Sequence, residues 1–440
     1  MVMHHHDLLD LLTRNGLSPA AAEQKAGLFA KAFGTLGDAA GVQTLAWFVP
    51  GRIEVLGKHT DYAGGSSMVV AAERGFCIAM RPRNDDQVRV IDALRKETIE
   101  FRMNPDLAPP VGHWSNYPMT VARRIARNFS ARLGAEISLA SDLPPAAGMS
   151  SSSALIIGIF LALAEANHLA SHPAMAALQA EPLDLAGYLG TIENGQSFGV
   201  LEGDRGVGTF GGSEDHTAIL CGRPNTIMQF AYCPVRFERA LPMPPGNTFV
   251  IAASGVVSEK TGEAREKYNR ASRLAAEAAG LWRQRTGRSD PHLAAVVRSD
   301  PGAAERLRDL LTDPELAARA RQFLLENEEV IPAAGRALES GDIAEFGRQV
   351  DRSQWGTEHL LGNQVPETIE LAAAARRLGA AAASAFGAGF GGGVWALAGS
   401  SEADGFLHAW REAYLQRFPQ HVGAAQFFVT AAGPAAFRVA

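Results

Sequence analysis

The chain has few of the features that mark disulfide-rich, membrane or nucleic-acid-binding proteins. Only three of its 440 residues are cysteines, and no two of them form a CxxC pair. This excludes a disulfide scaffold and a zinc site made of cysteines. The longest apolar stretch, residues 154–166, is shorter than the ~20 residues that a membrane helix needs. We therefore expect a protein that neither spans nor binds a membrane.

Excess charge of either sign is also absent. The chain has 41 lysines and arginines against 47 aspartates and glutamates, which gives a formal charge of −6. This balance supplies no basic surface of the kind that binds nucleic acid. The first ten residues carry three histidines and no apolar segment, so they do not resemble a signal peptide. Together with the small number of cysteines, this favours a cytoplasmic protein.

Glycine, by contrast, is abundant, with 45 residues, and the segments between the glycines mix strands and helices. Short apolar or alternating segments predict strands, and apolar positions that recur every three to four residues predict helices. The predicted strands are 45–56 (interrupted at Pro50–Gly51), 68–80, 87–103, 247–254 and 424–431, and the predicted helices cover 7–36, 153–166, most of 263–378 and 402–417. The fold class is therefore α/β or α+β.

The segment 50–62 reads PGRIEVLGKHTDY and gathers polar side chains around a glycine turn. Arg52 comes from the predicted strand, and Lys58, His59 and Asp61 follow the turn. Histidine and aspartate can each bond a sugar hydroxyl, and a carboxylate accepts two such bonds. The segment therefore indicates a hydroxyl-binding site, although a polar surface turn would have a similar composition.

A run of four serines, 150–153, follows Gly148 and Met149 and leads into the apolar helix. The N-terminus of a helix carries unpaired N–H groups and a positive dipole, which together attract anions. Serine hydroxyls add donors there and can also ligate magnesium. One serine would be explained as an N-cap, but four after a glycine favour a phosphate site. The run differs from the GxxxxGK[ST] loop, so no P-loop lysine is expected.

Two further glycine-rich segments carry less information by themselves. Residues 208–216 read GTFGGSEDH and place Asp215 in a polar turn, and for this segment alone a plain glycine-rich turn is the better description. Residues 386–393 read FGAGFGGG and precede an apolar strand. Glycine lets the backbone approach a ligand closely. A dinucleotide-binding loop would be followed by a helix, so we reject a Rossmann fold.

In this order, the four segments resemble the motifs of the galactokinases, which belong to the superfamily of galactokinase, homoserine kinase, mevalonate kinase and phosphomevalonate kinase (GHMP). Residues 51–62 resemble the galactokinase signature GRVNLIGEHTDY, and residues 144–154 are similar to the family's phosphate loop. Asp215 stands where the family carries its catalytic aspartate, and residues 386–393 resemble its third, glycine-rich motif. The resemblance extends over about residues 45–400, with lesser matches at 268–270 (YNR) and 365–367 (VPE).

The resemblance implies a two-lobed GHMP kinase fold with the active site between the lobes. The N-terminal domain would be α/β with a left-handed βαβ crossover, an exception to the usual handedness, and the C-terminal domain would be ferredoxin-like. We expect a helical extension over 1–44, the N-terminal kinase domain over 45–235 and the C-terminal kinase domain over 236–440. The implied reaction is phosphorylation of a sugar at its C1 hydroxyl by ATP with Mg²⁺, by a monomer or weak homodimer.

The resemblance also implies a role for each matching residue. Asp215 would be the catalytic base, and Arg52 would keep it ionised and stabilise the transferred phosphoryl group. The substrate would contact Lys58, His59, Asp61, Gly212 and Tyr268. The ATP phosphates would contact Gly148, Met149, Ser150, Ser151, Ser152 and Ser153, with Ser152 also contacting magnesium. Gly387, Gly389 and Gly391 would hold the third-motif loop near the phosphate loop and the substrate.

Lys58 is the main departure from the family pattern, because the family has a glutamate there that is thought to hold the sugar's C6 hydroxyl. A lysine would suit a carboxylate, so a uronic acid such as galacturonate is a candidate substrate, and a pentose is another. Alternatively, Lys58 turns to solvent or pairs with Glu54, which itself replaces an asparagine of the family. Ala146 replaces a loop glycine and His216 a glutamine, and neither change removes a group that the mechanism needs.

Two other functions are open. The first is a catalytically silent regulator that binds sugar and ATP, which the presence of Arg52, Asp215 and the serine run disfavours. The second is a kinase for a non-sugar alcohol such as mevalonate. The cluster of residues 59–61 (HTD) disfavours it, because this cluster belongs to the sugar branch of the superfamily.

Overall fold

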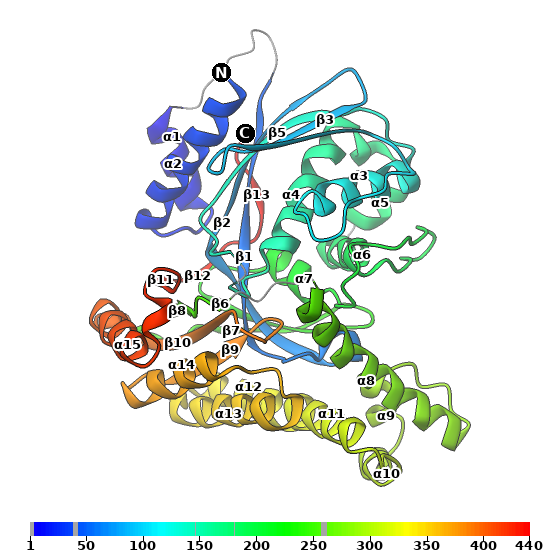
Figure 1. Cartoon of the computed structure of the whole chain (residues 1–440), viewed down its shortest axis with the longest axis vertical. Helices are drawn as coiled ribbons and strands as arrows, with labels where there is room; N and C mark the ends of the chain where they lie inside the picture. Colours follow the sequence, from blue (N-terminus) through cyan, green and yellow to red (C-terminus); the bar gives the residue numbers. More distant parts are fainter. Residues whose placement is uncertain (1–3, 38–42, 146, 180, 257–261) are drawn as a thin grey trace.

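Two β-sheets organise the molecule (Figure 1), whose computed structural model describes residues 4–37, 43–145, 147–179, 181–256 and 262–440. In the larger, nine-stranded sheet the main path runs β13-β1-β2-β5-β3-β4, with β6 and β12 also paired to β2 and β7 paired to β6. Its strands are β1 (Leu45–Leu56), β2 (Ser66–Pro82), β3 (Gln87–Asp92), β4 (Glu97–Arg102), β5 (Ala135–Ser141), β6 (Thr226–Ala231), β7 (Arg236–Pro242), β12 (Ala432–Gly433) and β13 (Phe437–Arg438).

Helices cover both faces of this sheet, so β1 is buried along its whole length. Successive side chains of a strand point to opposite faces. Phe48 accordingly packs with the N-terminal helices α1 (His5–Arg14) and α2 (Pro19–Leu36). Its neighbours Trp47 and Val49 pack in the main core. The helices of this second side are α3 (Asn116–Phe129), α4 (Ser151–Ala166), α5 (Pro173–Gln179) and α6 (Pro182–Asn194).

The helical segment predicted over 7–36 is two helices rather than one. The chain leaves the first helix at Gly16, whose φ is 104°. Ser18 then starts the second as its N-cap, with its Oγ accepting from the N–H of Ala21, and Pro19 takes the first helical position.

The interruption predicted at Pro50–Gly51 is a register shift within one continuous strand. Pro50 pairs with Gly75 of β2, whereas Arg52 pairs with Ala71, so two steps along β1 match four along β2. At this point the N–H of Arg52 bonds the carbonyl of Met149 instead of β2. The irregularity therefore ties the strand that carries Arg52 to the loop before α4.

The pair β3–β5 is the parallel one among the described strand pairs of this sheet, and all its other pairs are antiparallel. The chain between them passes through β4 and α3. Such a parallel pair requires a crossover connection. The left hand that the resemblance implies for the crossover stays a prediction.

The second sheet has the strand order β11-β8-β10-β9 and is antiparallel throughout. Its strands are β8 (Asn247–Ala253), β9 (Ala382–Phe386), β10 (Gly393–Gly399) and β11 (Gln426–Thr430). With α14 (Pro366–Arg377) before β9 and α15 (Ala403–Arg417) before β11, the unit has the βαββαβ pattern and strand order of a ferredoxin-like fold. This confirms the predicted C-terminal architecture.

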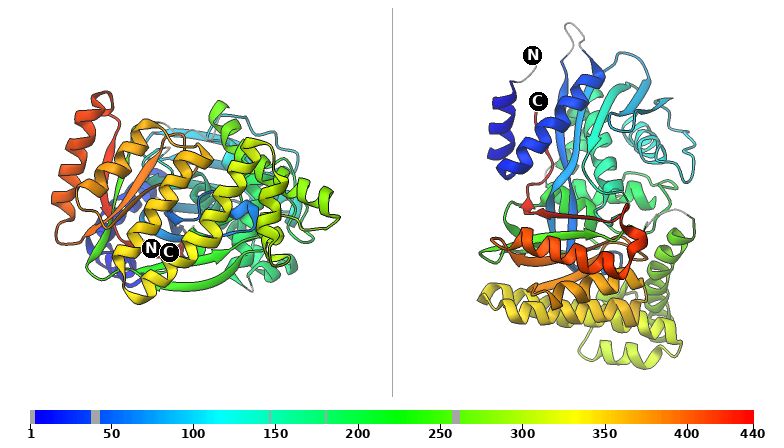
Figure 2. Two further views of the ribbon diagram at one scale, coloured as in Figure 1. Left: turned by 90° about the horizontal axis from the view of Figure 1, so that it is seen from below. Right: turned by 60° about the vertical axis from the view of Figure 1, so that its left-hand side comes forward.

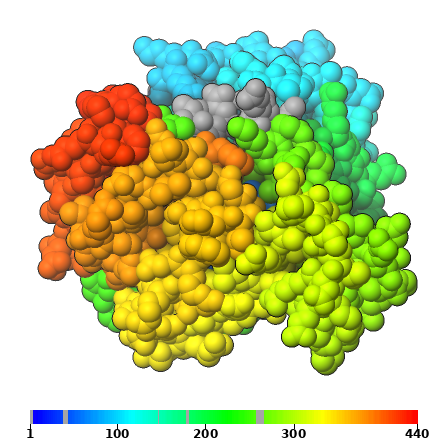
Figure 3. Space-filling model, turned by 60° about the horizontal axis from the view of Figure 1, so that its bottom comes forward, coloured from blue at the N-terminus to red at the C-terminus, as the bar shows by residue number. Residues whose placement is uncertain are grey.

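A long helical insertion separates β8 from β9. Figures 2 and 3 show it at one end of the molecule, with α15 (red) on the opposite side from α8 to α10 (green to yellow). The insertion comprises α8 (Gly262–Thr286), α9 (Leu293–Arg298), α10 (Ala303–Leu310), α11 (Pro314–Leu324), the π-helix η3 (Leu325–Val330), α12 (Ile331–Ser340), α13 (Ile343–Gly356) and the π-helix η4 (Thr357–Leu361).

The two sheets share one apolar core and part of the chain crosses between them. The largest hydrophobic cluster contains Val55 of β1, Ile331 of α12 and Trp395 of β10. Strand β7 and the C-terminal strands β12 and β13 join the nine-stranded sheet, although they lie beyond the predicted boundary at 235/236. Among the described helices, none has both the length and the apolar character required to cross a membrane.

Candidate active site

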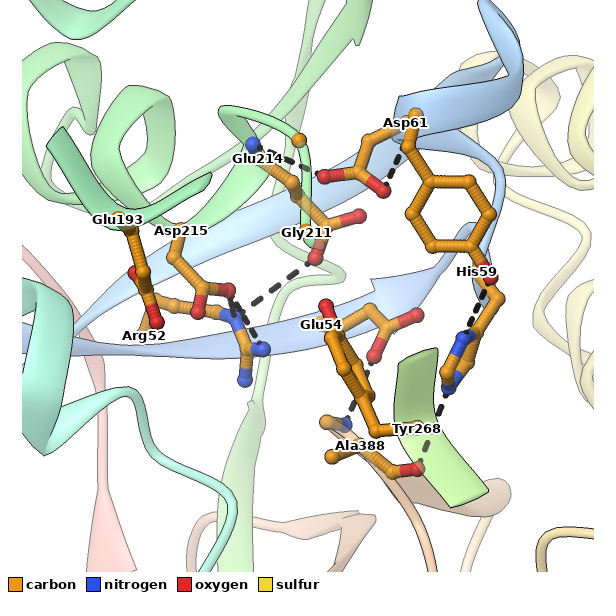
Figure 4. Close-up of a pocket in the computed structure, with 13 residues that line it drawn as sticks. Arg52, Glu54, His59, Asp61, Glu193, Gly211, Glu214, Asp215, Tyr268 and Ala388 are labelled. Atoms are coloured by element: carbon orange, nitrogen blue, oxygen red, sulfur yellow. Dashed lines mark hydrogen bonds and ion pairs between the residues drawn. The ribbon is translucent and has the colours of Figure 1, made fainter. Parts of the chain in front are cut away.

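A pocket lies between the two sheets, where β1, α6, α8 and three loops meet (Figure 4). Three of the four sequence motifs contribute residues to it. The fourth, the serine run, is next to the pocket, because Arg52 bonds the carbonyl of Gly148 in the loop that precedes the serines. The lining residues are Arg52, Glu54, His59, Asp61, Tyr62, Glu193, Gly211, Gly212, Glu214, Asp215, Tyr268, Gly387 and Ala388.

Arg52 and Asp215 form the ion pair at one end of the pocket. Nε and Nη2 of Arg52 each lie 2.7 Å from Oδ1 of Asp215, and Nη1 donates to the carbonyl of Gly148 at 2.5 Å. Burial by itself would lower the pKa of Arg52, but the carboxylates of Asp215, Glu214 and Glu54 together raise it above its ordinary value. The guanidinium is therefore a fixed positive charge beside the carboxylate that the family resemblance makes the base.

Asp215 also contacts the serine run. Helix α7 (Glu214–Cys221) begins within the segment 208–216 and carries Asp215 in its first turn. Oγ of Ser153, in the first turn of α4, lies 3.3 Å from Oδ2 of Asp215 and 3.0 Å from Oε2 of Glu193, so its one proton can be donated to either carboxylate. It is thus Ser153, rather than the predicted Ser152, whose hydroxyl meets the acidic groups of the site.

The oxygen atoms of Ser153, Glu193 and Asp215 are of the kind that binds magnesium. Magnesium is usually bound by one or two carboxylates together with phosphate oxygens and water. Ser153, Glu193 and Asp215 supply two carboxylates and one hydroxyl that lies within hydrogen-bonding distance of both. Among the described residues, no group of three or more His, Cys, Asp or Glu side chains is arranged to hold a metal by itself. A metal here would accordingly depend on nucleotide phosphates for further ligands.

The loop before α4 presents further polar groups. Ser150 sits at the N-cap with a left-handed backbone (φ 57°), and its buried Oγ has no hydrogen-bond partner within the described part of the chain. Ser151 and Ser152 are half-buried in the first helical turn, while Met149 is buried in the core. An unpaired hydroxyl at a helix N-terminus is a ready donor for an anion. Ala146 lies outside the described residues.

The segment 50–62, the sugar-type motif, forms the opposite wall of the pocket. After β1 the chain turns at Gly57 and passes into the short helix η1 (Asp61–Ala63). Nδ1 of His59 lies 2.7 Å from the hydroxyl of Tyr62, and Nε2 lies 3.2 Å from the carbonyl of Ala388. The ring of Tyr268 from α8 packs beside His59, with 5.2 Å between the ring centroids. These contacts fix the imidazole from three elements.

Asp61 is almost fully buried in this wall, at 8% exposure. One carboxylate oxygen accepts from the N–H of Tyr62 at 2.8 Å and the other from the N–H of Glu214 at 3.4 Å. Burial raises the pKa of Asp61 to about 6, and the charge of Asp215 adds to the rise. Gly212 packs against the same carboxylate, since a Cβ on it would stand 2.4 Å from Oδ2 of Asp61.

Three acidic residues in the pocket, Glu54, Glu193 and Glu214, were not predicted as site residues. Glu193 ends α6, and no motif surrounds it. Glu214 precedes Asp215 and lies 3.7 Å from Nε of Arg52. Burial raises the pKa of Glu214 well above its ordinary value, and the neighbouring Glu54 raises it further. The position of Glu214 next to Asp215 in the segment 208–216 was the one signal that could have identified it.

Lys58 does not line the pocket. Its side chain is 2% exposed, and Nζ donates to the backbone carbonyl of Glu54 at 3.2 Å. The buried carboxylate of Glu326, from η3, accepts from the N–H groups of Gly57 and Lys58 and from the hydroxyl of Ser353. Lys58 therefore neither reaches solvent nor pairs with the carboxylate of Glu54. The basis for a substrate carboxylate at this position is removed.

The glycine-rich loop after β9 closes the pocket from the C-terminal lobe. Gly387 and Gly148 both have positive φ, 79° and 76°, and their backbones pack so closely that a Cβ on either would meet the other segment at 2.8 Å. Gly389 packs against Asn363 and Gly391 against Val256. Of the three predicted glycines, Gly387 is thus the one that joins this loop to the phosphate loop.

Three family models match the chain. The "Galactokinase galactose-binding signature" matches residues 28–82, the "GHMP kinases N terminal domain" residues 116–203, and the "GHMP kinases C terminal" model residues 336–416. The first covers β1 and the sugar-type motif, and the last covers the glycine-rich loop.

Several curated proteins and a solved structure similar to this chain are galactokinases. The chain is 31% identical to the galactokinase of Roseiflexus sp. over 379 residues, which cover 83% of this chain and 86% of the relative. It is 28% identical to the galactokinase of Chloroflexus aurantiacus over 375 residues, 84% of this chain and 87% of the relative. The crystal structure of Lactococcus lactis galactokinase complexed with galactose superimposes with a TM-score of 0.76 at 24% identity, over 93% of this chain and 97% of that one. The chain therefore belongs to the galactokinase family of GHMP kinases.

Proposed function

We propose that this protein transfers the γ-phosphoryl group of ATP to the C1 hydroxyl of galactose. The observation that carries the proposal is the position of the Arg52–Asp215 ion pair in the same pocket as His59 and Asp61. The family model of the galactose-binding signature covers Arg52, His59 and Asp61, and Asp215 comes from the segment 208–216.

Asp215 and Arg52 would be the catalytic residues. Asp215 accepts the proton of the C1 hydroxyl, or holds that hydroxyl in line with the phosphoryl group. Arg52 is permanently charged and stabilises the negative charge of the phosphoryl group in transfer. Its bond to the carbonyl of Gly148 fixes the guanidinium where the phosphate loop begins.

The N-terminus of α4 and its serines would bind the phosphates of ATP. The free hydroxyl of Ser150 and the unpaired N–H groups of the first turn point to an anion there. Ser153, Glu193 and Asp215 would hold magnesium, which neutralises phosphate charge when bound.

His59, Asp61 and Tyr268 would orient the sugar. A neutral hexose suits this pocket better than a sugar acid, because its lining contains five carboxyl groups and one guanidinium. A pentose lacks one hydroxyl-bearing carbon of a hexose, so it would leave part of the pocket wall formed by the segment 50–62 without a hydrogen-bonding partner. A silent regulator is disfavoured because the base, the arginine and the phosphate loop are all in contact. The reaction would take place in the cytoplasm, where ATP is available.

A panel of sugars assayed for ATP-dependent phosphorylation tests this function. We expect galactose to be the best substrate and galacturonate and pentoses to be poor ones. Production of ADP with mevalonate but with no sugar would contradict the proposal.

A further inference from the structure

Glu54 occupies the place in the pocket that the sequence predicts for residue 58. It lies two residues after Arg52 on β1, so both side chains leave the strand on the same face and reach the pocket. Lys58 turns the other way and is buried beside Glu326. The substrate side of this segment thus has a carboxylate at 54, whereas the galactokinase signature has asparagine there and glutamate at 58.

The surroundings of Glu54 leave it available to a substrate. The side chain is 3% exposed, and Oε2 accepts from the N–H of Gly387 at 2.7 Å. Figure 4 shows the second carboxylate oxygen turned towards the interior of the pocket, on the side of His59. A carboxylate has about four acceptor sites, so one backbone bond does not saturate it.

The charges around Glu54 also favour a substrate hydroxyl over a substrate carboxylate. Asp61, Glu193, Glu214 and Asp215 also line the pocket. Among the described lining residues the one guanidinium is that of Arg52, which already pairs with Asp215. A substrate carboxylate placed near Glu54 would meet like charge in a buried site, which is costly. A hydroxyl would instead donate to the carboxylate in a charge-assisted hydrogen bond.

We infer that Glu54 is a specificity-determining residue whose carboxylate binds a hydroxyl of the sugar and excludes sugar acids. The inference rests on the proposed sugar-kinase function and adds a residue to it. It reverses the expectation drawn from Lys58, because the charge that faces the substrate is negative.

The test compares wild type with Glu54→Gln on galactose, galacturonate and the singly deoxygenated galactoses. On galactose the variant should lose about tenfold or more in kcat/KM, mainly through KM, as expected for losing a charged hydrogen-bond acceptor. On the deoxy sugar that lacks the bound hydroxyl, variant and wild type should be about equal. The preference for galacturonate relative to galactose should rise about tenfold or more. An equal loss on every deoxy sugar, or an unchanged galacturonate ratio, would overturn the inference.

Three controls separate this role from a structural one. Glu54→Asn restores the family's residue and should show the same pattern if the glutamine variant fails to fold. Glu73→Gln changes a buried strand glutamate outside the pocket and should leave the ranking of sugars unchanged. Lys58→Met should also leave the galacturonate ratio unchanged. A wild type that phosphorylates none of these sugars would overturn the proposed function, whereas an active wild type with an unaltered ranking in Glu54→Gln would overturn the role of Glu54 alone.

Discussion

Replacing Asp61 by asparagine should stabilise the free enzyme at neutral pH while it weakens sugar binding. The side chain is buried, and its pKa is raised to about 6, first by burial and then by the nearby charge of Asp215. The folded protein therefore binds this proton more tightly than the unfolded chain does. The resulting stabilisation is complete below about pH 4 and is lost as the pH rises through about 6.

The size of the effect follows from the difference between the two pKa values. Each tenfold change in proton affinity corresponds to about 1.4 kcal/mol, so a rise from 3.8 to about 6 corresponds to about 3 kcal/mol. Asparagine is neutral at every pH and keeps an oxygen that can accept from the N–H of Tyr62. For a chain of 440 residues, about 3 kcal/mol is about 3 °C in melting temperature.

Thermal unfolding of wild type and Asp61→Asn at several pH values between 4 and 8 measures this difference. We expect the melting temperature of the variant relative to wild type to rise by about 3 °C across this range, and its KM for galactose to rise as well. Asp404→Asn, on the exposed surface of α15, should show no comparable pH dependence. A constant difference between Asp61→Asn and wild type across the range would refute the reasoning.

The remaining predictions concern the metal, the sugar loop and the arginine. Ser153→Ala should raise the magnesium concentration needed for half-maximal turnover, and Ser152→Ala should do so far less; equal effects of the two would contradict the assignment. Glu326→Ala should lower the free energy of unfolding by about 1–3 kcal/mol for each buried N–H group that it leaves without an acceptor, measured by denaturant titration. Arg52→Lys should lower kcat by about tenfold or more with little change in the affinity for ATP, because lysine lacks the fork that spans Asp215 and the carbonyl of Gly148; an unchanged kcat would argue against it.

Motifs allowed the sequence to predict residues that fold together over long distances. Arg52 and Asp215 are 163 positions apart. The composition of residues 50–62 indicated a hydroxyl-binding site that includes Arg52, His59 and Asp61. Asp215, Gly212 and Tyr268, which line the same pocket, were predicted only because their segments resemble the motifs of the galactokinases.

Side-chain direction was much less predictable. Whether Lys58 faces the substrate depends on Glu326, 268 residues away. No local sequence pattern predicts the contact between these two residues. Glu193 ends an ordinary helix, and its place in the site follows only from how α6 packs beside α4. The choice between Ser152 and Ser153 depends on the rotation of α4 about its axis, which four identical side chains do not specify.

In the fold, too, local elements were more predictable than contacts between distant segments. The apolar segments predicted β1, β2, β8, β11 and the long helices, because buried elements have largely apolar sequences. They did not predict β5, β6 or β9, and they merged β3 and β4 into one segment. Sequence periodicity did not predict that β7, β12 and β13 complete the N-terminal sheet, since these strands are short and pair with residues far along the chain. Such pairings depend on the tertiary structure rather than on local preference.

The most direct test of the account is the phosphorylation of galactose by wild type and Asp215→Asn, followed by phosphorus NMR. We expect wild type to produce galactose 1-phosphate and ADP in equal amounts, and Asp215→Asn to bind ATP and galactose but to form product at least about a hundredfold more slowly. Phosphorylation at another hydroxyl, or near-normal turnover by Asp215→Asn, would contradict it.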